Sequence, residues 1–444
     1  MILPPLKNCS VAVIGLGYVG LPLALELGKK RINKKDGKLL ERKIIGFDIK
    51  EERIDFILKG IDTTKETSKE EIAKAKNIEY TCDPKKLSNA DVFIISVPTP
   101  ITEDKEPDLN PLILASKTVG KALLERVKDC LPIIVYESTV YPGTTEDICV
   151  PILEKESKLK FNKEFFCGYS PERINPGDPN NRLPNIKKVT SGSTKESAIW
   201  VDEFYSSIID AGTHLASSIK VAEAAKIIEN TQRDLNIALI NELAKIFNLL
   251  DIDTLDVLEA ARTKWNFLDF RPGLVGGHCI GVDPYYLTYK AKKLGFYPSV
   301  VLAGRETNDG ISSWISKRII TYLEEKNLNL NTINILIMGF TFKNNCPDTR
   351  NTKVLQIYNI LCSEGINVEI FDPLVDVVEV KNIYNINILE KLPLKKKYQV
   401  VIAAVNHDYF VNLSRMEWQR LISKDGFFFD IKGIIPRDLN VIRI

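Results

Sequence analysis

The chain has 444 residues, more than one compact hydrophobic core usually holds, and this length predicts two or three domains. Hydrophobic residues make up 44% and charged residues 27%, which is ordinary for a globular protein and argues against a disordered or fibrous one. Because 60 Lys and Arg nearly balance 58 Asp and Glu, the formal net charge is only +2, and no general attraction to nucleic acid or to an anionic membrane is expected.

The N-terminal segment and the cysteines indicate the compartment. Met1–Lys7 lacks a basic stretch followed by an apolar one, so it does not resemble a secretory signal. No apolar run reaches the roughly 18 residues that a membrane-spanning helix needs. The eight cysteines are scattered without a CxxC pair, which argues against a zinc site or a disulfide framework. We therefore expect a soluble, cytoplasmic protein with reduced thiols and no bound metal.

The first half of the chain alternates short apolar runs with longer helical segments. Strands are predicted at Cys9–Ile14, Ile44–Asp48, Asp91–Val97, Pro132–Ser138 and Phe165–Ser170. Helices are predicted at Leu21–Lys30, Leu112–Val127 and Thr144–Glu154. Apolar strands that alternate with helices are typical of parallel βαβ units in a doubly wound sheet.

The segment GLGYVG, Gly15–Gly20, follows the first predicted strand and opens the first predicted helix. Gly15 permits a tight turn, Gly17 lets a pyrophosphate approach the backbone, and Gly20 lets the helix pack on the strand. Such glycines also mark ordinary turns, so the motif alone is weak. Asp48, at the end of the next strand, could bind ribose hydroxyls and would repel a 2′-phosphate, which favours NAD over NADP.

The distance in sequence from this motif to Asp48 is longer than the roughly 20 residues usual for dinucleotide-binding folds. The mostly charged segment Arg31–Arg42 accounts for the extra length. We expect this segment to be a surface insertion that forms a solvated loop.

A long helix and a second α/β block follow. Ala216–Phe247 contains no Pro or Gly and keeps apolar residues at helical spacing, which predicts one long helix or two nearly continuous ones, able to connect domains and to support dimerisation. The second block begins near Thr332. Strands are predicted there at Ile333–Met338, Asn367–Asp372, Gln399–Ala404 and Phe427–Ile431, with a helix at Thr352–Cys362. The predicted fold is α/β, with two Rossmann-like doubly wound domains joined by a long central helix.

The segment GGHCIGVDP, Gly276–Pro284, is the strongest candidate for chemistry. Paired glycines allow a ligand to approach the backbone, and Asp283 is a plausible start for the helix that follows. Cys279 is a candidate nucleophile, because backbone amides in such a loop can stabilise a thiolate and later an oxyanion. Most buried cysteines are inert, but the glycine pair and the polar neighbours favour a functional thiol here.

A series of motifs in order along the chain resembles one family. They are GLGYVGLP (Gly15–Pro22), SVPTP (Ser96–Pro100), STVYPGTT (Ser138–Thr145), SPERINPGD (Ser170–Asp178), AEAAKIIENTQRDLNIALINE (Ala222–Glu242), GGHCIGVDPYYL (Gly276–Leu287) and GFTFKNNCPDTRNT (Gly339–Thr352). Together they resemble the UDP-glucose and UDP-N-acetylhexosamine 6-dehydrogenases, over residues 9–431.

The resemblance implies three parts: an NAD-binding Rossmann-like domain at 1–210, a central helical dimerisation region with the cysteine loop at 211–328, and a UDP-sugar-binding Rossmann-like domain at 329–444. It also implies a four-electron oxidation that uses NAD twice. Cys279 would add to the C6 aldehyde, and the thiohemiacetal keeps the hydrogen that must leave as hydride. The resulting thioester would be hydrolysed to the carboxylate. The expected partners are a UDP-sugar and a second copy of the chain, in a homodimer or a higher homo-oligomer.

The resemblance also assigns catalytic roles beside the thiol. Glu172 resembles the general base for thioester hydrolysis, and Thr139 resembles a water-positioning hydroxyl. Lys226 resembles the residue that stabilises an oxyanion, and Asn230, one helical turn away, faces the same site. Asp283 would order water or that ammonium group.

The remaining expected contacts are to the cofactor and the substrate. Cofactor-binding residues are expected to be Gly15, Gly17, Tyr18, Val19, Gly20, Asp48, Arg53, Pro98, Thr99, Ser138, Thr139 and Arg350. Substrate-binding residues are expected to be Glu172, Arg173, Lys226, Asn230, Arg262, Gly276, His278, Phe342 and Lys343. Lys343 resembles a contact to the substrate phosphate, and Arg262 resembles an arginine that reaches the neighbouring subunit's substrate. Singly, each charged residue could equally be a solvated surface group; together, within the motifs, they favour the functional interpretation.

The cysteine loop bears on the sugar. UDP-glucose enzymes of the family carry a loop resembling GGSCF, whereas this chain has GGHCI, with His278 and Ile280 around the thiol. This form resembles the UDP-N-acetylhexosamine enzymes of bacterial surface-polysaccharide synthesis (lipopolysaccharide and capsule), and UDP-N-acetylglucosamine is the predicted substrate. UDP-N-acetylgalactosamine, UDP-N-acetylmannosamine and UDP-glucose stay open, because epimers are distinguished by polar partners that the sequence does not locate.

Two other classes of function compete. A two-electron NAD-dependent dehydrogenase would explain the glycine motif, Lys226 and Asn230, but not Cys279 or the second α/β block. A non-catalytic sensor of NAD or of a UDP-sugar would bind without turnover, since a fold does not fix a function. No helix-turn-helix or basic stripe indicates a nucleic-acid partner.

Overall fold

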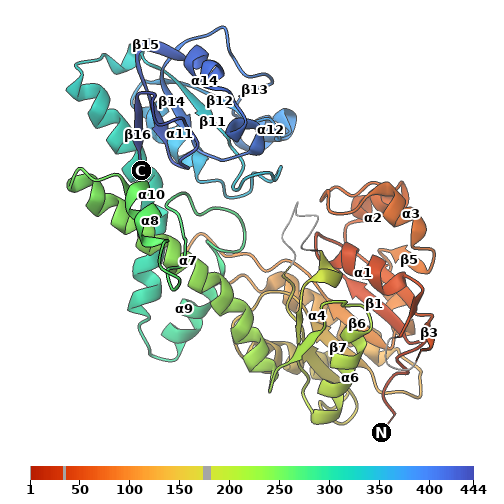
Figure 1. The fold of residues 1–444 in the computed structure, drawn as a ribbon. Coiled ribbons are helices and arrows are strands. Elements are labelled where there is room, and N and C mark those ends of the chain that lie inside the picture. The colour runs from red at the N-terminus through yellow and green to blue at the C-terminus, as the bar shows by residue number, and fades with distance from the viewer. Residues whose placement is uncertain (1, 34–36, 174–181) are drawn as a thin grey trace. The chain divides into compact units, whose positions relative to one another are not determined.

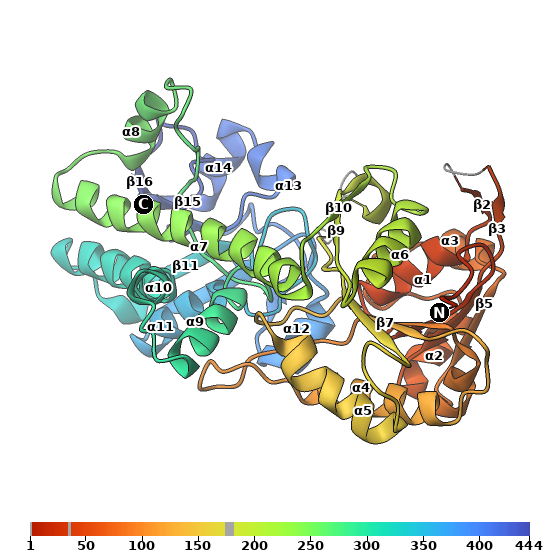
Figure 2. The same cartoon turned by 90° about the horizontal axis from the view of Figure 1, so that it is seen from below.

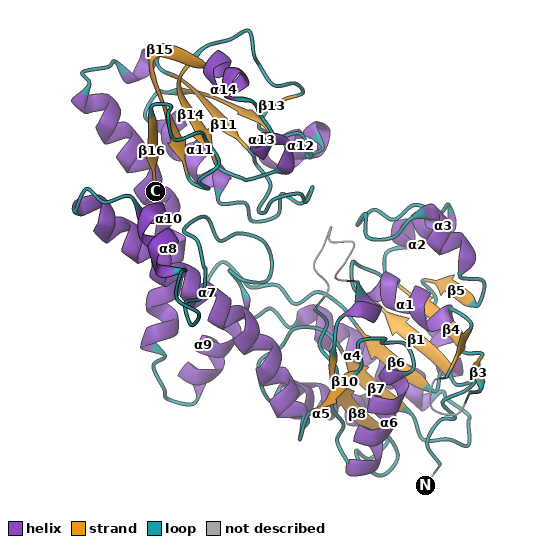
Figure 3. Ribbon diagram, in the orientation of Figure 1, coloured by secondary structure: helices purple, strands orange, loops and turns teal. Residues whose placement is uncertain are grey.

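The computed structural model describes residues 2–33, 37–173 and 182–444, and the chain forms two compact units (Figure 1). The first unit comprises Met1–Glu229 and Tyr285–Leu294, and the second comprises Asn230–Pro284 and Gly295–Ile444. Each unit contains a six-stranded parallel sheet flanked by helices (Figure 3). This arrangement confirms the predicted α/β fold class with two Rossmann-like sheets.

The sheet of the first unit has the strand order β5-β4-β1-β6-β7-β8. Its strands are β1 (Ser10–Ile14), β4 (Lys43–Phe47), β5 (Ile78–Thr81), β6 (Val92–Ile95), β7 (Ile133–Tyr136) and β8 (Phe166–Tyr169). If the six strands of this sheet are numbered by their order along the chain, they lie in the order 3-2-1-4-5-6. This is the order of doubly wound dinucleotide-binding sheets. Ligands bind such sheets beyond the carboxyl ends of the strands, where the strand order reverses, and this point lies between β1 and β6.

Helices cover both faces of this sheet. They are α1 (Gly20–Gly28), α2 (Glu51–Leu58), α3 (Lys69–Lys74), α4 (Asn110–Leu124), α5 (Val150–Ser157) and α6 (Lys195–Ser206). Apolar residues of α1, α2 and α6 form one core with the sheet, and those of α4 and α5 form a second core on the opposite face. The central strands are therefore buried on both sides, which explains their almost continuous apolar sequences. A short parallel pair, β9 (Lys188–Thr190) and β10 (Thr213–Leu215), lies outside the large sheet.

The helix predicted at Thr144–Glu154 has two parts. Thr145–Cys149 forms a π-helical turn in which the amide of Val150 donates to the carbonyl of Thr145, and α5 continues from Val150. Pro151 explains the interruption, because it has no N–H to donate into the preceding turn and its ring crowds that turn.

The segment Arg31–Arg42 contains two short strands and a buried arginine that the sequence did not predict. The short strands β2 (Arg31–Ile32) and β3 (Leu39–Leu40) pair antiparallel, whereas 34–36 lie outside the described residues. Arg42 is only 2% exposed: its Nε donates to the carbonyl of Leu6 at 3.0 Å, and its guanidinium lies 4.4 Å from the ring centre of Phe204. The expectation of a solvated loop is therefore wrong at Arg42, where hydrogen bonds and a ring face offset the cost of burying the charge.

Helix α7 (Ile219–Leu249) is one uninterrupted helix of 31 residues, which confirms the predicted long central helix. It is followed by α8 (Thr254–Ala261), α9 (Asp283–Lys293) and α10 (Ser299–Glu325). Within the second unit, α10 packs closely on the C-terminal part of α7 (Figure 2), since a Cβ on Gly304 would lie 2.4 Å from the side chain of Leu235. Buried polar groups join the two helices: the Arg305 guanidinium contacts Asp234 at 2.6 Å.

The second unit repeats the topology of the first, with the strand order β13-β12-β11-β14-β15-β16. The strands are β11 (Asn334–Met338), β12 (Asn367–Phe371), β13 (Ile388–Leu389), β14 (Tyr398–Ala403), β15 (Ile422–Asp430) and β16 (Val441–Arg443). The helices beside them are α11 (Val354–Ser363), α12 (Val377–Tyr384), α13 (Asp408–Val411) and α14 (Arg415–Leu421). Within the described ranges, no helix is both long enough and apolar enough to cross a membrane.

Candidate active site

The glycine motif forms a tight turn at the carboxyl end of β1. Gly15 has φ +90° and donates its amide to the carbonyl of Phe47 at 2.9 Å, and a Cβ on Gly20 would lie 1.8 Å from the carbonyl oxygen of Gly15. Among the described residues, no atom lies within 4 Å of the position that a Cβ on Gly17 would take. The backbone at Gly17 and the N-terminus of α1 therefore leave room for a pyrophosphate, so these residues fit NAD.

Two charged residues support this turn from the protein side. Asp48 accepts the amide of Leu16 at 2.9 Å, and Arg53 donates from Nε to the Leu16 carbonyl at 2.8 Å. The Arg53 guanidinium also contacts the buried carboxylate of Asp62 at 2.8 Å. Asp48 can still accept ribose hydroxyls, because each carboxylate oxygen has two lone pairs. The cofactor-binding roles of Asp48 and Arg53 stay predictions.

The loops after β6 and β7 are tied together beside this turn. The Ser138 hydroxyl donates to the carbonyl of Val97 at 2.6 Å, and the Thr99 hydroxyl donates to the carbonyl of Thr139 at 2.7 Å. Tyr286, in α9, donates its hydroxyl to the carbonyl of Thr99 at 2.6 Å. The structure thus gathers Thr99, Ser138 and Thr139 at the carboxyl ends of neighbouring strands.

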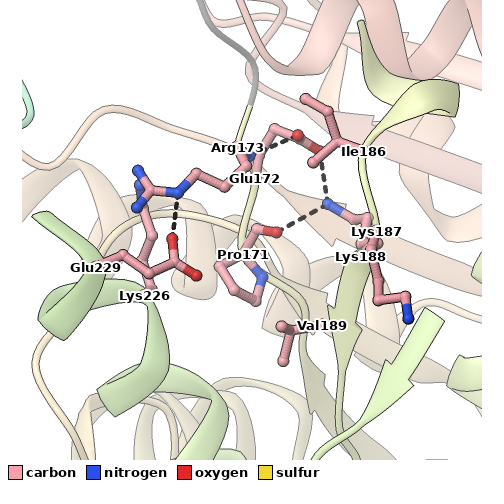
Figure 4. Close-up of a pocket in the computed structure, with 9 residues that line it drawn as sticks. All are labelled: Pro171, Glu172, Arg173, Ile186, Lys187, Lys188, Val189, Lys226 and Glu229. Carbon is pink, nitrogen blue, oxygen red and sulfur yellow. Dashed lines mark hydrogen bonds and ion pairs between the residues drawn. The ribbon is translucent and has the colours of Figure 1, made fainter. Parts of the chain in front are cut away.

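A pocket in the first unit contains two of the expected catalytic residues (Figure 4). It is lined by Pro171, Glu172, Arg173, Ile186, Lys187, Lys188, Val189, Lys226 and Glu229. Glu172 and Lys226 are 8% and 6% exposed, and Arg173 forms an ion pair with Glu229. The structure therefore brings together a buried carboxylate and a buried ammonium group around one cavity. The later residues of SPERINPGD, 174–178, lie outside the described residues.

The cysteine loop of the second unit turns directly into α9. The amides of Val282 and Asp283 donate to the carbonyl of Cys279 at 3.0 and 2.8 Å, and the thiol-bearing residue is partly exposed. The Asn230 side-chain amide donates to the carboxylate of Asp283, and these two residues are 1% and 2% exposed. Asn230 on α7 is thus fixed to the helix that follows Cys279.

The glycines before Cys279 accommodate the loop after β11. Gly277 has φ +78°, and a Cβ there would lie 2.7 Å from the ring of Phe342. The Asn351 side-chain amide donates to the carbonyl of Gly277 at 2.9 Å, and the ring of His278 lies 6.2 Å from that of Phe342. The expected substrate contacts Gly276, His278 and Phe342 therefore lie in one cluster of loops.

The remaining expected contacts lie nearer the surface of the second unit. The Lys343 ammonium lies 5.7 Å from the ring centre of Phe342. Arg350 is exposed and forms an ion pair with Asp348 at 2.5 Å, and Arg262, at the C-terminal end of α8, is half exposed and paired with Glu259 at 2.8 Å. Their roles stay predictions.

Two groups of buried residues escaped the sequence analysis. Lys188 forms ion pairs with Glu137 and with Glu172. The charged Glu137, at the end of an otherwise apolar strand, was the feature of the sequence that could have indicated these buried charges. In the second unit, Asp372 accepts the amides of Phe340 and Thr341, and His407 accepts the amide of Asn345 at 2.9 Å. These contacts fix the backbone on both sides of Phe342.

Comparisons with known proteins find relatives along almost the whole chain. Three models of the UDP-glucose/GDP-mannose dehydrogenase family match the chain: the NAD binding domain at residues 9–209, the central domain at 220–310 and the UDP binding domain at 336–437. The UDP-N-acetyl-D-glucosamine 6-dehydrogenase of Pseudomonas aeruginosa is 50% identical, over 99% of this chain and all of its own. The protein CapL of Staphylococcus aureus is 50% identical over 98% of both chains. Among solved structures, a UDP-D-ManNAc dehydrogenase from Pyrococcus horikoshii superposes with a TM-score of 0.84 at 26% identity, over 98% of this chain and 99% of that one.

Proposed function

Because the chain belongs to the UDP-glucose/GDP-mannose dehydrogenase family, we propose that it oxidises the C6 alcohol of UDP-N-acetylglucosamine to a carboxylate, with NAD as electron acceptor. The resemblance inferred from the motifs is confirmed, and the chain is an NAD-dependent UDP-sugar dehydrogenase. The observation that carries the choice of sugar is the full-length 50% identity to a UDP-N-acetyl-D-glucosamine 6-dehydrogenase. The named mannosamine enzyme, at 26% identity, is a more distant relative.

The proposed chemistry uses the residues to which the motif resemblance assigns roles. NAD held at Gly15–Gly20 would supply the acceptor for the hydride that leaves C6 in each of the two oxidations. Between them, the Cys279 sulfur bonds to the aldehyde carbon and the thiol proton ends on the C6 oxygen. The carbon keeps its hydrogen until the second oxidation, which removes it as hydride and leaves a thioester on Cys279. In each oxidation the proton of the C6 hydroxyl passes to water.

Hydrolysis of that thioester needs a base and a stabilised oxyanion. The water oxygen bonds to the carbonyl carbon while its proton passes to the Glu172 carboxylate. Lys226 stabilises the negative charge on the carbonyl oxygen, the C–S bond breaks, and Cys279 leaves as a thiolate. The buried Asn230–Asp283 pair holds the residues around the nucleophile in place.

The division of the chain at 210 and 328, the assembly as a homodimer or higher homo-oligomer, and a role in bacterial surface-polysaccharide synthesis belong to the same proposal. The division is supported by the order of the three matched domains, and the assembly by the uninterrupted 31-residue helix α7.

The test is to count NADH formed per sugar consumed with UDP-N-acetylglucosamine, UDP-N-acetylgalactosamine, UDP-N-acetylmannosamine and UDP-glucose. About two NADH per UDP-N-acetylglucosamine are expected, because the thioester route removes two hydrides. Two NADH with another sugar alone would replace the proposed substrate. One NADH per sugar would overturn the thioester route in favour of a two-electron dehydrogenase, and binding without NADH would indicate a sensor.

A further inference from the structure

The ammonium group of Lys188 is buried beside Glu172, the proposed general base. The Lys188 Nζ donates to the Glu172 carboxylate at 2.7 Å, to the Glu137 carboxylate at 3.2 Å and to the carbonyl of Pro171 at 3.2 Å (Figure 4 shows the first and third of these). The side chains of Lys188, Glu137 and Glu172 are 2%, 0% and 6% exposed. All three protons of the ammonium group therefore have acceptors, and water is nearly excluded.

The cluster formed by Lys188, Glu137 and Glu172 also contacts helix α6. The Tyr205 hydroxyl donates to the second oxygen of Glu137, and the Lys188 Nζ lies 5.1 Å from the ring centre of Tyr205. The second oxygen of Glu172 accepts the amide of Arg173 at 2.6 Å. Glu172 is thus oriented at both oxygens, with Lys188 on one and a backbone amide at the pocket on the other.

The charges of these three side chains show what the Lys188 ammonium group contributes. Two buried carboxylates share one ammonium group, so the cluster carries a net charge of −1 when all three are ionised. Without the cation, two carboxylates this close and this buried would not both stay ionised, and one would take up a proton. Burial raises the pKa of the Glu137 carboxyl, and Lys188 opposes that rise. Without Lys188, Glu172 would also lose the charged contact that orients one of its two oxygens.

We propose that Lys188 is a positioning residue for thioester hydrolysis, which holds the Glu172 carboxylate aimed into the pocket that Lys226 also lines. The proposal rests on the proposed function, in which Glu172 takes the proton of the attacking water. Lys188 acts only through Glu172 and takes no part in either hydride transfer. Its loss therefore slows the release of the product and leaves the formation of the thioester intact.

The experiment follows the covalent intermediate in the full-length enzyme with NAD and UDP-N-acetylglucosamine. Lys188→Met is expected to lower kcat about 100-fold, the lower end of what a positioned general base contributes. The burst of about two NADH per active site is expected to persist, and intact-mass spectrometry should find the sugar acyl group on Cys279. Lys188→Arg, which keeps the cation, should restore much of the hydrolysis. Lys195→Met, the same change at an exposed lysine of α6, is the matched control.

A second variant, in which the net charge of the cluster is unchanged, distinguishes the proposed role of Lys188 from a general loss of folding. The double variant Glu137→Gln/Lys188→Met keeps the cluster at −1 and leaves no second buried carboxylate, so it should fold better than Lys188→Met. It should still accumulate the acyl-enzyme, because Glu172 has lost the contact that orients it, whereas Glu137→Gln alone keeps the Lys188–Glu172 contact and should not. Normal turnover in the double variant, or activity lost without an acyl-enzyme in a folded protein, would overturn the role of Lys188. Failure of the wild-type enzyme to form two NADH would overturn the proposed function instead.

Discussion

At the scale of a single residue, the Cys279 thiol is needed by the four-electron thioester route and not by a two-electron dehydrogenase. It is partly exposed in a loop whose backbone turns into α9, which suits attack on a bound aldehyde. Cys279→Ser is expected to lower carboxylate formation at least about 1,000-fold, because an alcohol is a far weaker nucleophile and its adduct does not lead to a thioester. The measurement is product carboxylate by mass spectrometry, alongside NADH.

The control for this substitution is Cys82→Ser, an exposed cysteine of the first unit that no step uses. It should leave turnover unchanged. Full NADH formation by Cys279→Ser would contradict the thioester route and would favour a two-electron dehydrogenase.

The candidate site was predictable where a motif carried the chemistry. Cys279, Glu172 and Lys226 stand in recognisable segments, and the structure places the last two around one pocket. Lys188 and His407 were not predictable in this way. Their roles depend on burial and on partners such as Glu137 and Asp372, which lie 51 and 35 residues away in sequence. Single charged residues in a sequence do not reveal which of them lose contact with water.

The elements of the fold were predictable wherever the buried surface is apolar. Strands β1, β6 and β7 differ by only one or two residues at their ends from the predicted segments, because they are covered by helices on both faces. Helix α10 was not predicted, since part of its buried face is polar: Arg305, Asn308 and Ser312 are 0–2% exposed. A buried face that depends on ion pairs and amides gives a weak apolar period.

At the scale of elements, the loop before α9 and the loop after β11 meet where Gly277 contacts the ring of Phe342. Gly277→Ala is expected to cost about 1–2 kcal/mol for the left-handed backbone and about 1–3 kcal/mol more for the contact with Phe342. The displaced ring should also raise the KM for the UDP-sugar. Thermal unfolding and steady-state kinetics would measure the two effects.

Gly295→Ala is the matched control for the backbone effect. Its φ of +79° is nearly that of Gly277, yet among the described residues no atom would lie within 4 Å of the new Cβ. It should show only the smaller loss of stability and an unchanged KM. Equal effects of the two substitutions would contradict a specific contact between Gly277 and Phe342.

Helix α7 also holds the loop after β7, through Glu223. This carboxylate is fully buried and accepts the amides of Gly143 at 2.6 Å and Thr145 at 2.9 Å. Burial raises the pKa of Glu223 from 4.5 to about 7, although the two amide hydrogen bonds oppose the rise. The native state therefore binds a proton that the unfolded state has lost between pH 4.5 and about 7, so stability falls as the pH rises through that window.

Comparison with Glu223→Gln isolates this effect. The stability of the wild-type protein relative to the variant should fall by about 3 kcal/mol as the pH rises from about 5 to about 8, which is the free energy equivalent to the raised pKa. Scanning calorimetry at several pH values would show it as a shrinking difference in Tm. A difference in Tm that stays constant or grows with pH would contradict the assignment.

At the scale of the whole molecule, substitution of Arg262 tests whether two subunits share an active site in the expected homodimer. This residue ends α8, is half exposed, and is paired only loosely with Asp269 at 4.0 Å beyond its contact with Glu259. If Arg262 serves the substrate of a second copy, a dimer that combines a Cys279→Ser subunit with an Arg262→Ala subunit contains one complete site. That site takes its thiol from the second subunit and its arginine from the first.

Such mixed dimers can be purified by two different tags and tested beside each homodimer, with light scattering to establish the mass of the assembly. Because a two-fold dimer has two equivalent sites, the mixed dimer is expected to reach about half of the wild-type activity, although both homodimers are weak. An arginine that acts within its own subunit would give no such recovery, since each of the two sites would then lack one of its groups. Recovery of activity would therefore place Arg262 in the neighbouring site, and a mixed dimer no more active than the mean of the two homodimers would exclude it.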